Sequence, residues 1–274
     1  MAREYKSSQD WVKVWIASSD DSFPLAGLLL HPADANPWAV LVVCHGFTGS
    51  KEGGGRTLDM GRFLADRTGV AVLVFDFAGH GESRGAFEDL TLSRQIRDLG
   101  AVVDWCGSEL GLPVLSTGRS FGGTTVVCRA AADERIRAVC TWAAPGRPYE
   151  LFHGMAADQD GRWVTFSSSE ATVRLRRAFL EDLKQYDVLA AAGALAPRPL
   201  MVVHGDQDND VLPREAELIH ASAGEPKAIR IIPDADHRFQ VNAGLAWEAT
   251  REWIECVMQA QVAFLLDKPG ENHY

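Results

Sequence analysis

The chain has 274 residues, of which 46% are hydrophobic and 23% are charged, so it is long enough to bury a large core. Its net charge of −10 disfavours nonspecific attraction to nucleic acid or to an anionic membrane. No apolar run approaches the roughly 20 residues of a membrane span, and no hydrophobic stretch typical of a secretory signal follows the polar residues 1–8.

Short apolar runs alternate with helix-like segments along most of the chain. Residues 11–16 and 25–30 are extended runs with a turn-forming Asp-Asp-Ser between them, which predicts an antiparallel hairpin at a sheet edge. Apolar runs predict strands buried on both faces at 39–44 and 70–75, and further strands are predicted at 114–117, 136–142, 200–203 and 228–232. Helical spacing predicts helices within 53–67, 93–110, 124–132 and 246–265. This alternation predicts a mostly parallel α/β sheet covered on both faces.

One connection is much longer than the others. Over fifty residues separate the strand that ends near Ala144 from the one that starts near Leu200. Residues 161–166 resemble a strand and residues 171–186 a helix. We therefore predict a core domain of residues 1–146 and 196–274 and a small cap of residues 147–195. We expect the cap to lie over the carboxyl ends of the strands, where open α/β sheets bind ligands.

A Gly-x-Ser-x-Gly sequence at 118–122 lies between a predicted strand and a predicted helix. This is the context of a nucleophile elbow, a sharp turn that projects a serine hydroxyl from the sheet edge. Ser120 is thus the candidate nucleophile. Gly118 and Gly122 are needed because side chains there would collide with the neighbouring strand and helix.

The strand at 39–44 ends in His45-Gly46-Phe47. Gly46 would let the chain turn away from the strand, so that the backbone N–H of Phe47 points to the position of a substrate oxygen. The N–H of Phe121, directly after the nucleophile, would be its partner. Two such donors form an oxyanion hole.

A general base and its acid partner are predicted after the last two strands. Asp206, Asp208 and Asp210 compete for the acid position, Asp210 being also placed to cap the helix after Pro213; we choose Asp208. His237 follows the last strand and can reach back to Ser120. The carboxylate would fix the imidazole tautomer and stabilise its protonated form.

The other histidines are assigned simpler roles. His45, His80 and His204 lie at strand or loop ends and are predicted to be structural, whereas His153 is a candidate for the cap's pocket. No two histidines lie four residues apart and no Cys-x-x-Cys occurs, so we expect no metal and no cofactor. The odd number and wide spacing of the cysteines predict buried free thiols in a reducing, cytoplasmic compartment: Cys44, Cys106, Cys128, Cys140 and Cys256.

From about residue 25 to 265 the chain resembles the α/β-hydrolase superfamily. The resemblance rests on ordered motifs: His45-Gly46-Phe47, Asp-Phe-Ala-Gly-His-Gly-Glu-Ser at 76–83, Gly-Arg-Ser-Phe-Gly-Gly at 118–123, His-Gly-x-x-Asp at 204–208 and Asp-His-Arg-Phe at 236–239. The order serine, acid, histidine is that of the α/β-hydrolase fold. The family pattern places the acid at the fifth residue of His-Gly-x-x-Asp, which supports Asp208. The resemblance implies an α/β-hydrolase fold.

Within this superfamily the chain is most similar to small bacterial carboxylesterases of the cinnamoyl and feruloyl esterase type. In those enzymes a compact cap contacts the aromatic acyl group, and relatives more often carry His or Gln where this chain has Arg119. The candidate pocket residues are Arg119, Tyr149, Phe152, Trp163 and Phe166. For the four cap aromatics, packing of the cap against the core is an equally good interpretation.

These observations predict a serine esterase that acts through an acyl-enzyme on a small ester, with an aromatic acyl group as the expected type. A thioesterase or acyl-peptide hydrolase with the same residues is an alternative, as is a non-catalytic protein that binds ligands on a hydrolase fold. The expected partner is a small-molecule ester rather than nucleic acid or membrane, and the candidate assembly is a homodimer.

Overall fold

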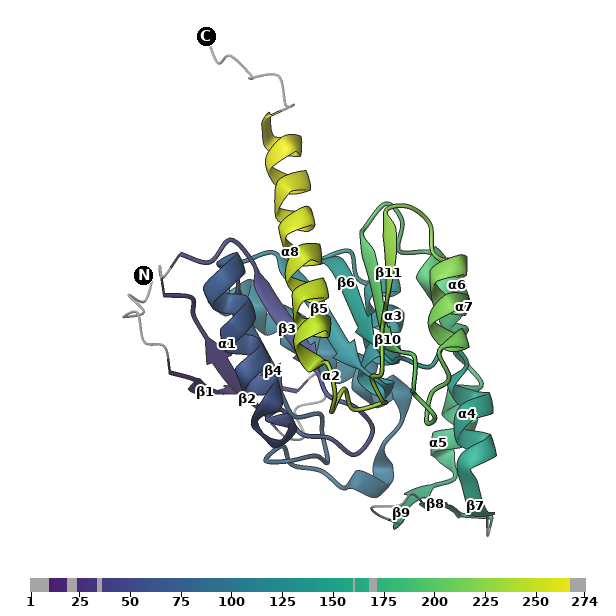
Figure 1. Ribbon diagram of the computed structural model, residues 1–274. Coiled ribbons are helices and arrows are strands. Elements are labelled where there is room, and N and C mark those ends of the chain that lie inside the picture. Colours follow the sequence, from purple (N-terminus) through teal and green to yellow (C-terminus); the bar gives the residue numbers. More distant parts are fainter. Residues whose placement is uncertain (1–9, 19–23, 34–35, 160, 168–171, 267–274) are drawn as a thin grey trace.

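The computed structural model describes residues 10–18, 24–33, 36–159, 161–167 and 172–266. Its centre is an eight-stranded sheet of order β1-β2-β4-β3-β5-β6-β10-β11, in which the strands from β4 to β11 are mutually parallel (Figure 1). The antiparallel hairpin is confirmed, although its turn lies outside the described residues. The strands are β1 (Val12–Ile16), β2 (Leu25–Leu30), β3 (Val40–Cys44), β4 (Ala71–Phe75), β5 (Val114–Arg119), β6 (Ile136–Trp142), β10 (Leu200–Gly205) and β11 (Lys227–Ile232).

Helices cover both faces of this sheet, as predicted. In Figure 1, α1 and α8 lie in front of the strands, and α2 and α3 lie behind them. Successive side chains of a strand point to opposite faces, so Leu41 joins the apolar cluster beneath α1 and α8, whereas Val42 joins the cluster beneath α2 and α3. The helices of the core are α1 (Arg56–Thr68), α2 (Leu92–Trp105), α3 (Phe121–Ala132), α7 (Arg214–Ser222) and α8 (Ala243–Leu266). Shorter helical turns are η1 (Gly53–Gly55), η2 (Phe87–Asp89) and η3 (Cys106–Leu110).

The long connection between β6 and β10 forms an insertion with its own small antiparallel sheet, of order β7-β8-β9. It lies at the end of the main sheet that faces down in Figure 1. Side chains fasten it to the core: Ser93 Oγ lies 2.6 Å from the hydroxyl of Tyr186, and Arg147 pairs with Glu215 on α7. Its elements are α4 (Pro148–Met155), β7 (Ala156–Gln159), β8 (Trp163–Ser167), β9 (Thr172–Arg176), α5 (Ala178–Leu183) and α6 (Val188–Gly193).

The prediction of one helix over residues 171–186 is wrong in its first part. Residues 172–176 form β9, and the helix α5 begins only at Ala178. The segment Thr-Val-Arg-Leu-Arg alternates apolar with polar side chains, and pairing with β8 buries Leu175 completely. The strand forms because this alternation matches a sheet with one buried face.

Four of the five cysteines are buried, as predicted, but Cys256 is exposed. The buried stripe of α8 contains Ala249, Trp253 and Val257. These residues are spaced three to four apart and face the sheet, and Cys256 lies on another side of the helix. Burial raises the pKa of Cys44, which leaves this thiol protonated.

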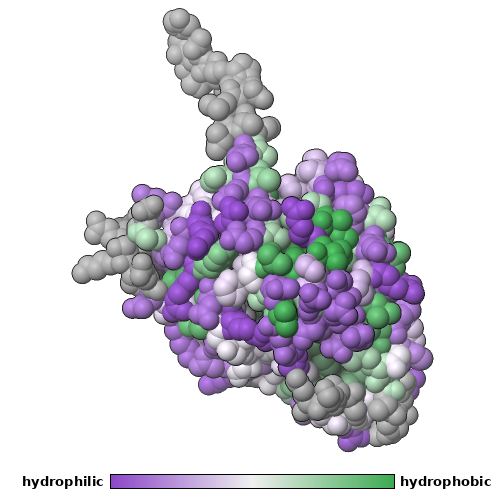
Figure 2. Space-filling model, in the orientation of Figure 1, coloured by the Kyte–Doolittle hydropathy of each residue, from purple (hydrophilic) through white to green (hydrophobic). Residues whose placement is uncertain are grey.

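The face of the molecule in Figure 2 is largely hydrophilic. Its hydrophobic residues gather to the right of α8, over β11, where Ile231 is 41% exposed. In the part of the chain that the structure describes, no helix has the length and apolarity needed to cross a bilayer.

Candidate active site

Ser120 occupies the sharp turn between β5 and α3. Its backbone has φ 54° and ψ −126°, a conformation that residues other than glycine rarely adopt. The turn is closely packed: a Cβ on Gly118 would lie 2.4 Å from the backbone of Gly122, and one on Gly122 would lie 2.3 Å from the carbonyl oxygen of His45. The predicted requirement for both glycines is confirmed, and the strained turn holds the Ser120 hydroxyl clear of the sheet.

His237 brings two distant parts of the chain together. Its Nε2 lies 3.0 Å from Ser120 Oγ, and its Nδ1 lies 2.8 Å from Asp208 Oδ2. An ionised carboxylate only accepts hydrogen bonds, so Nδ1 carries the proton and Nε2 is left to accept from the serine hydroxyl. Asp208 and His237 are neighbours because they follow β10 and β11, adjacent parallel strands whose carboxyl ends meet at one sheet edge.

Asp208 is buried and accepts several hydrogen bonds. Its Oδ1 accepts from the amides of Asp210 and Val211, at 3.0 and 2.8 Å, and its Oδ2 lies 3.1 Å from Nε2 of His204. Burial alone would raise the pKa of Asp208, but the hydrogen bonds from His204 and His237 outweigh it and hold that pKa below its usual range. Asp208 is therefore ionised at neutral pH.

The two competing carboxylates have other roles. Asp206 is exposed, and its Oδ1 accepts from the amide of Asp234 at 2.8 Å. Asp210 is exposed too. It does not cap the helix α7, contrary to one expectation for it, because Pro213 occupies the N-cap position and no side chain bonds the helix start there. Of the three, Asp208 is the one that bonds His237.

The segment His45-Gly46-Phe47 is held from both sides by histidines. The ring of His45 lies 2.8 Å from the Gly46 carbonyl through Nδ1 and accepts from the Phe77 amide through Nε2, at 3.2 Å. His80 donates from Nε2 to the carbonyl of Phe47, at 2.9 Å. In a trans peptide the N–H points opposite to the C=O, so the Phe47 N–H points away from the ring of His45. Burial, followed by the nearby His80, lowers the pKa of His45 to about 3, which keeps that ring neutral.

The same loop is anchored by a buried lysine that sequence reasoning did not assign a role. Lys51 Nζ lies 2.8 Å from Asp76, 2.8 Å from Glu82 and 2.7 Å from Glu52, and its side chain is 1% exposed. Its amide also donates to Asp76 Oδ1 at 2.7 Å. Burial opposes the charge, but the bonds to Asp76, Glu52 and Glu82 dominate and raise the pKa of Lys51.

Replacing Lys51 with methionine is expected to lower the free energy of unfolding by about 3–5 kcal/mol, because Asp76 would remain buried without its counter-charge. Urea unfolding followed by circular dichroism measures this loss. The matched control is Lys13→Met, which removes an exposed partner of the same Glu82 at 2.6 Å and is expected to cost at most about 1 kcal/mol. Equal losses in the two variants would contradict a central role for the buried pair.

A cavity of about 150 Å³ opens beside Ser120 and His237. Arg119, Phe152 and Phe166 line it, as three of the five predicted pocket residues. Tyr149 and Trp163 do not line it: Tyr149 packs against His153, and Trp163 stacks under Arg174 on the outside of the insertion. On β8, Val164 and Phe166 point inward and Trp163 has the opposite parity. His153 is exposed and does not line the cavity.

Several lining residues were not predicted. Leu151 and Met155, one helical turn apart on α4, face the cavity, and Val173 faces it from β9. Pro148 is typical of a helix start, and apolar residues at 151, 152 and 155 have the spacing of one helix face. Together these signals could have predicted an amphipathic helix here. Within the described residues, no group of three or more His, Cys, Asp or Glu side chains is arranged to hold a metal ion.

A strained serine turn at the end of a parallel sheet, joined by hydrogen bonds to a histidine and an aspartate, is the arrangement of the α/β class of hydrolases. The family model described as "Alpha/beta hydrolase family" matches residues 41–249. The chain belongs to this family.

Other proteins are similar to this chain in sequence or in fold. The chain is 26% identical over 171 residues to "Uncharacterized protein YfhR" of Salmonella typhimurium, a match that covers 61% of this chain and 55% of that protein. It superposes on Est1E from Butyrivibrio proteoclasticus, solved with ferulic acid bound, with a TM-score of 0.80 and 24% identity over 91% of this chain and 99% of that one. An esterase domain of a Rhodothermus marinus protein gives a TM-score of 0.73 and 26% identity, over 89% and 97%.

Proposed function

We propose that the protein hydrolyses carboxylic esters through a covalent acyl-enzyme on Ser120. The observation that carries the proposal is the hydrogen-bonded chain from Ser120 through His237 to Asp208. His237 takes the serine proton as Ser120 attacks the ester carbonyl, and then returns it to the leaving alcohol. Water, activated by the same histidine, hydrolyses the acyl-enzyme.

The amides of Phe47 and Phe121 are the proposed oxyanion hole. Two observations support this role. Among the described residues neither N–H donates to a protein acceptor, and His45 orients the Gly46–Phe47 peptide so that its N–H points away from the imidazole. Loss of one such donor in other enzymes lowers kcat by about 10²–10³-fold.

We further propose that residues 147–195 act as a cap and that the cavity beneath it holds an aromatic acyl group of the cinnamoyl or feruloyl type. The rings of Phe47, Phe152 and Phe166 pack against one another, with centroids 4.9–5.8 Å apart, and form one wall of the cavity. Its volume of about 150 Å³ equals that of an engineered apolar cavity that binds benzene. The esterase description of the Rhodothermus structure and the ferulic acid in Est1E agree with this assignment.

The test of the reaction is a fluorophosphonate probe combined with a graded substrate panel. We expect the probe to label Ser120 and the enzyme to hydrolyse 4-nitrophenyl esters from acetyl to feruloyl. Thioester and amide analogues of one acyl group separate esterase from thioesterase and acyl-peptide hydrolase activity. An unlabelled Ser120 with no turnover of any analogue would leave a ligand-binding protein as the function.

The aromatic wall is tested by Phe152→Ala. We expect kcat/KM for a feruloyl ester to fall at least about tenfold more than for an acetyl ester, because the acetyl group is too small to reach the wall. Trp163→Ala is the control, since Trp163 belongs to the same insertion but does not line the cavity. A uniform decrease for both esters would argue against aromatic recognition by this cavity.

A further inference from the structure

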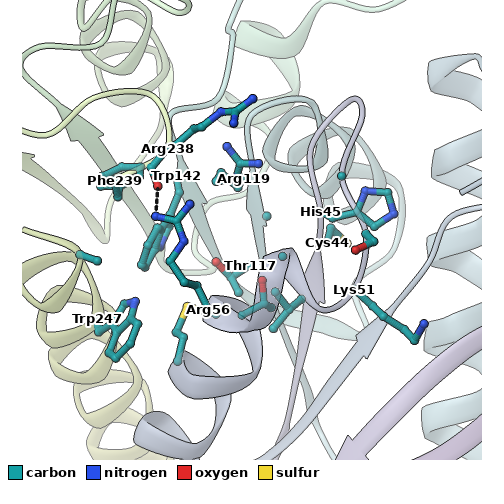
Figure 3. A pocket seen from close by; sticks show the side chains of 18 residues that line it. Cys44, His45, Lys51, Arg56, Thr117, Arg119, Trp142, Arg238, Phe239 and Trp247 are labelled. Atoms are coloured by element: carbon teal, nitrogen blue, oxygen red, sulfur yellow. Dashed lines mark hydrogen bonds between the residues drawn. The ribbon is translucent and has the colours of Figure 1, made fainter. Parts of the chain in front are cut away.

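A second cavity, of about 110 Å³, adjoins the first and shares Arg119 and Arg238 with it (Figure 3). It is enclosed by the carboxyl ends of β3, β5 and β6, by the start of α1 and by the start of α8. Trp142 and Trp247 form apolar walls, with Phe239 and Met60 beside them. The two cavities therefore meet at Arg119 and Arg238, beside the Ser120 elbow.

The second cavity is lined by several basic residues, although the chain as a whole has a net charge of −10. Four of its 18 lining residues are basic, and none is Asp or Glu: the basic residues are Lys51, Arg56, Arg119 and Arg238. Lys51 is neutralised by its three carboxylates. In contrast, among the described residues no carboxylate lies within 4.0 Å of the guanidinium nitrogens of Arg56 or Arg119.

These two arginines make only weak contacts with the protein. Arg56 Nη1 donates to the carbonyl of Arg238 at 3.4 Å, the bond dashed in Figure 3, and Arg119 Nη1 donates to the carbonyl of His237 at 3.4 Å. A guanidinium has five N–H donors, so most donors of both groups are available to a ligand.

Arg119 is placed beside the reacting serine. A Cβ built on Gly46 would lie 3.3 Å from Ser120 Cβ and 3.6 Å from Arg119 Nη2, so the guanidinium lies against the Gly46–Phe47 segment. Its other contact is the carbonyl of His237. Burial, and then the charges of Arg238 and Arg56, lower the pKa of Arg119, whereas Asp208 and Asp236 act in the opposite direction. Three clustered positive charges repel one another, and a bound anion would relieve that repulsion.

We propose that this cavity is a subsite for a carboxylate or phosphate oxyanion, held by Arg56 and Arg119 and carried on a small apolar group that packs against Trp142 and Trp247. Arginine pairs with both kinds of oxyanion through two parallel N–H bonds. The anion is a group of the ester substrate or a free small molecule. The first source rests on the proposed function; the second does not.

Binding is measured without turnover in a Ser120→Ala background. Benzoate, its neutral isostere benzamide, and inorganic phosphate are titrated while the tryptophan fluorescence of the protein, to which Trp142 and Trp247 contribute, is followed. We expect benzoate to bind at least about tenfold more tightly than benzamide, as charged hydrogen bonds provide. Arg56→Gln and Arg119→Gln should each remove this preference and the binding of phosphate. Arg62→Gln, on the same helix α1 but outside the cavity, should leave both unchanged.

The source of the anion is identified with the wild-type enzyme and two matched esters, 4-nitrophenyl hydrogen succinate and its methyl ester. A preference for the anionic ester, expressed in KM and lost in Arg119→Gln, assigns the subsite to the substrate. Arginine-dependent binding of benzoate or phosphate without that preference assigns it to a free anion. Equal binding of benzoate and benzamide, unaffected by either arginine variant, overturns the proposal. Since Arg56 is exposed, the Arg56→Gln variant tests anion binding even where Arg119→Gln disturbs the elbow. The binding measurements do not depend on ester turnover, so they test the subsite even where no ester is hydrolysed.

Discussion

Replacing Ser120 with alanine is expected to lower kcat for 4-nitrophenyl ester hydrolysis by about 10⁴–10⁶-fold, the range found when a nucleophile that acts together with a base is removed. The reason is that His237 Nε2, 3.0 Å from Ser120 Oγ, would have no hydroxyl to deprotonate. Steady-state assays with a chromogenic ester measure the loss, and labelling by a fluorophosphonate should disappear in parallel.

Two controls keep this result interpretable. Far-ultraviolet circular dichroism should show an unchanged fold, since alanine at position 120 leaves the close packing around Gly118 and Gly122 unchanged. Ser116→Ala, a buried serine on β5 whose Oγ contacts the carbonyl of Val42 at 3.4 Å, should retain kcat within about tenfold. Near wild-type turnover in Ser120→Ala would refute the assignment of the nucleophile.

Asp208→Asn is expected to lower kcat by about 10⁴-fold. An amide offers its NH₂ group or its C=O to His237 Nδ1, and the imidazole can then adopt the tautomer whose Nε2–H faces Ser120 and accepts no proton. The lowered pKa of Asp208 adds a pH effect. An unfolded Asp titrates near about 3.9, so the ionised folded form contributes stability above that pH, and this contribution is lost as pH falls through the folded pKa.

The pH effect distinguishes Asp208 from its neighbours. Between about pH 5 and pH 3 the Asn variant should lose less unfolding free energy than the wild type, because one stabilising carboxylate no longer titrates. Asp206→Asn, which alters an exposed carboxylate of the same loop that does not bond His237, should keep kcat within about tenfold. If both variants lost activity equally, loop disruption rather than loss of the acid would be the cause.

The sequence was most informative where a residue's role follows from its place at the end of a buried strand. Ser120 and His237 are 117 positions apart, yet Ser120, Asp208 and His237 each lie on the turn or loop that follows a strand, and parallel strands bring such positions to one edge. The same logic located His45-Gly46-Phe47. A strand in a mostly parallel sheet can be recognised from its apolar residues, which is why the positions of these residues at one sheet edge could be predicted.

Prediction failed where the tertiary partner decides the structure. The strand β9 is short and charged, and it is stable because β8 buries Leu175. No sequence spacing connects Arg56 on α1 with Arg119 at the end of β5, which meet because α1 packs across the sheet. Lys51 reaches Asp76 because these residues follow the adjacent parallel strands β3 and β4. For Trp163 the aromatic character suggested a pocket, but the parity of β8 turned the side chain outward.

The position of β11 has a consequence for how the proposed activity would be lost. This strand is the edge of the sheet and bonds only β10 among the described strands, whereas β5, which leads to Ser120, has neighbours on both sides. Edge strands open in local fluctuations that cost less free energy than global unfolding. Opening of β11 would move the His237 loop away and leave the serine elbow intact. Low concentrations of urea should therefore abolish turnover before the central strands unfold. Under the same conditions the amides of β11 should undergo hydrogen exchange.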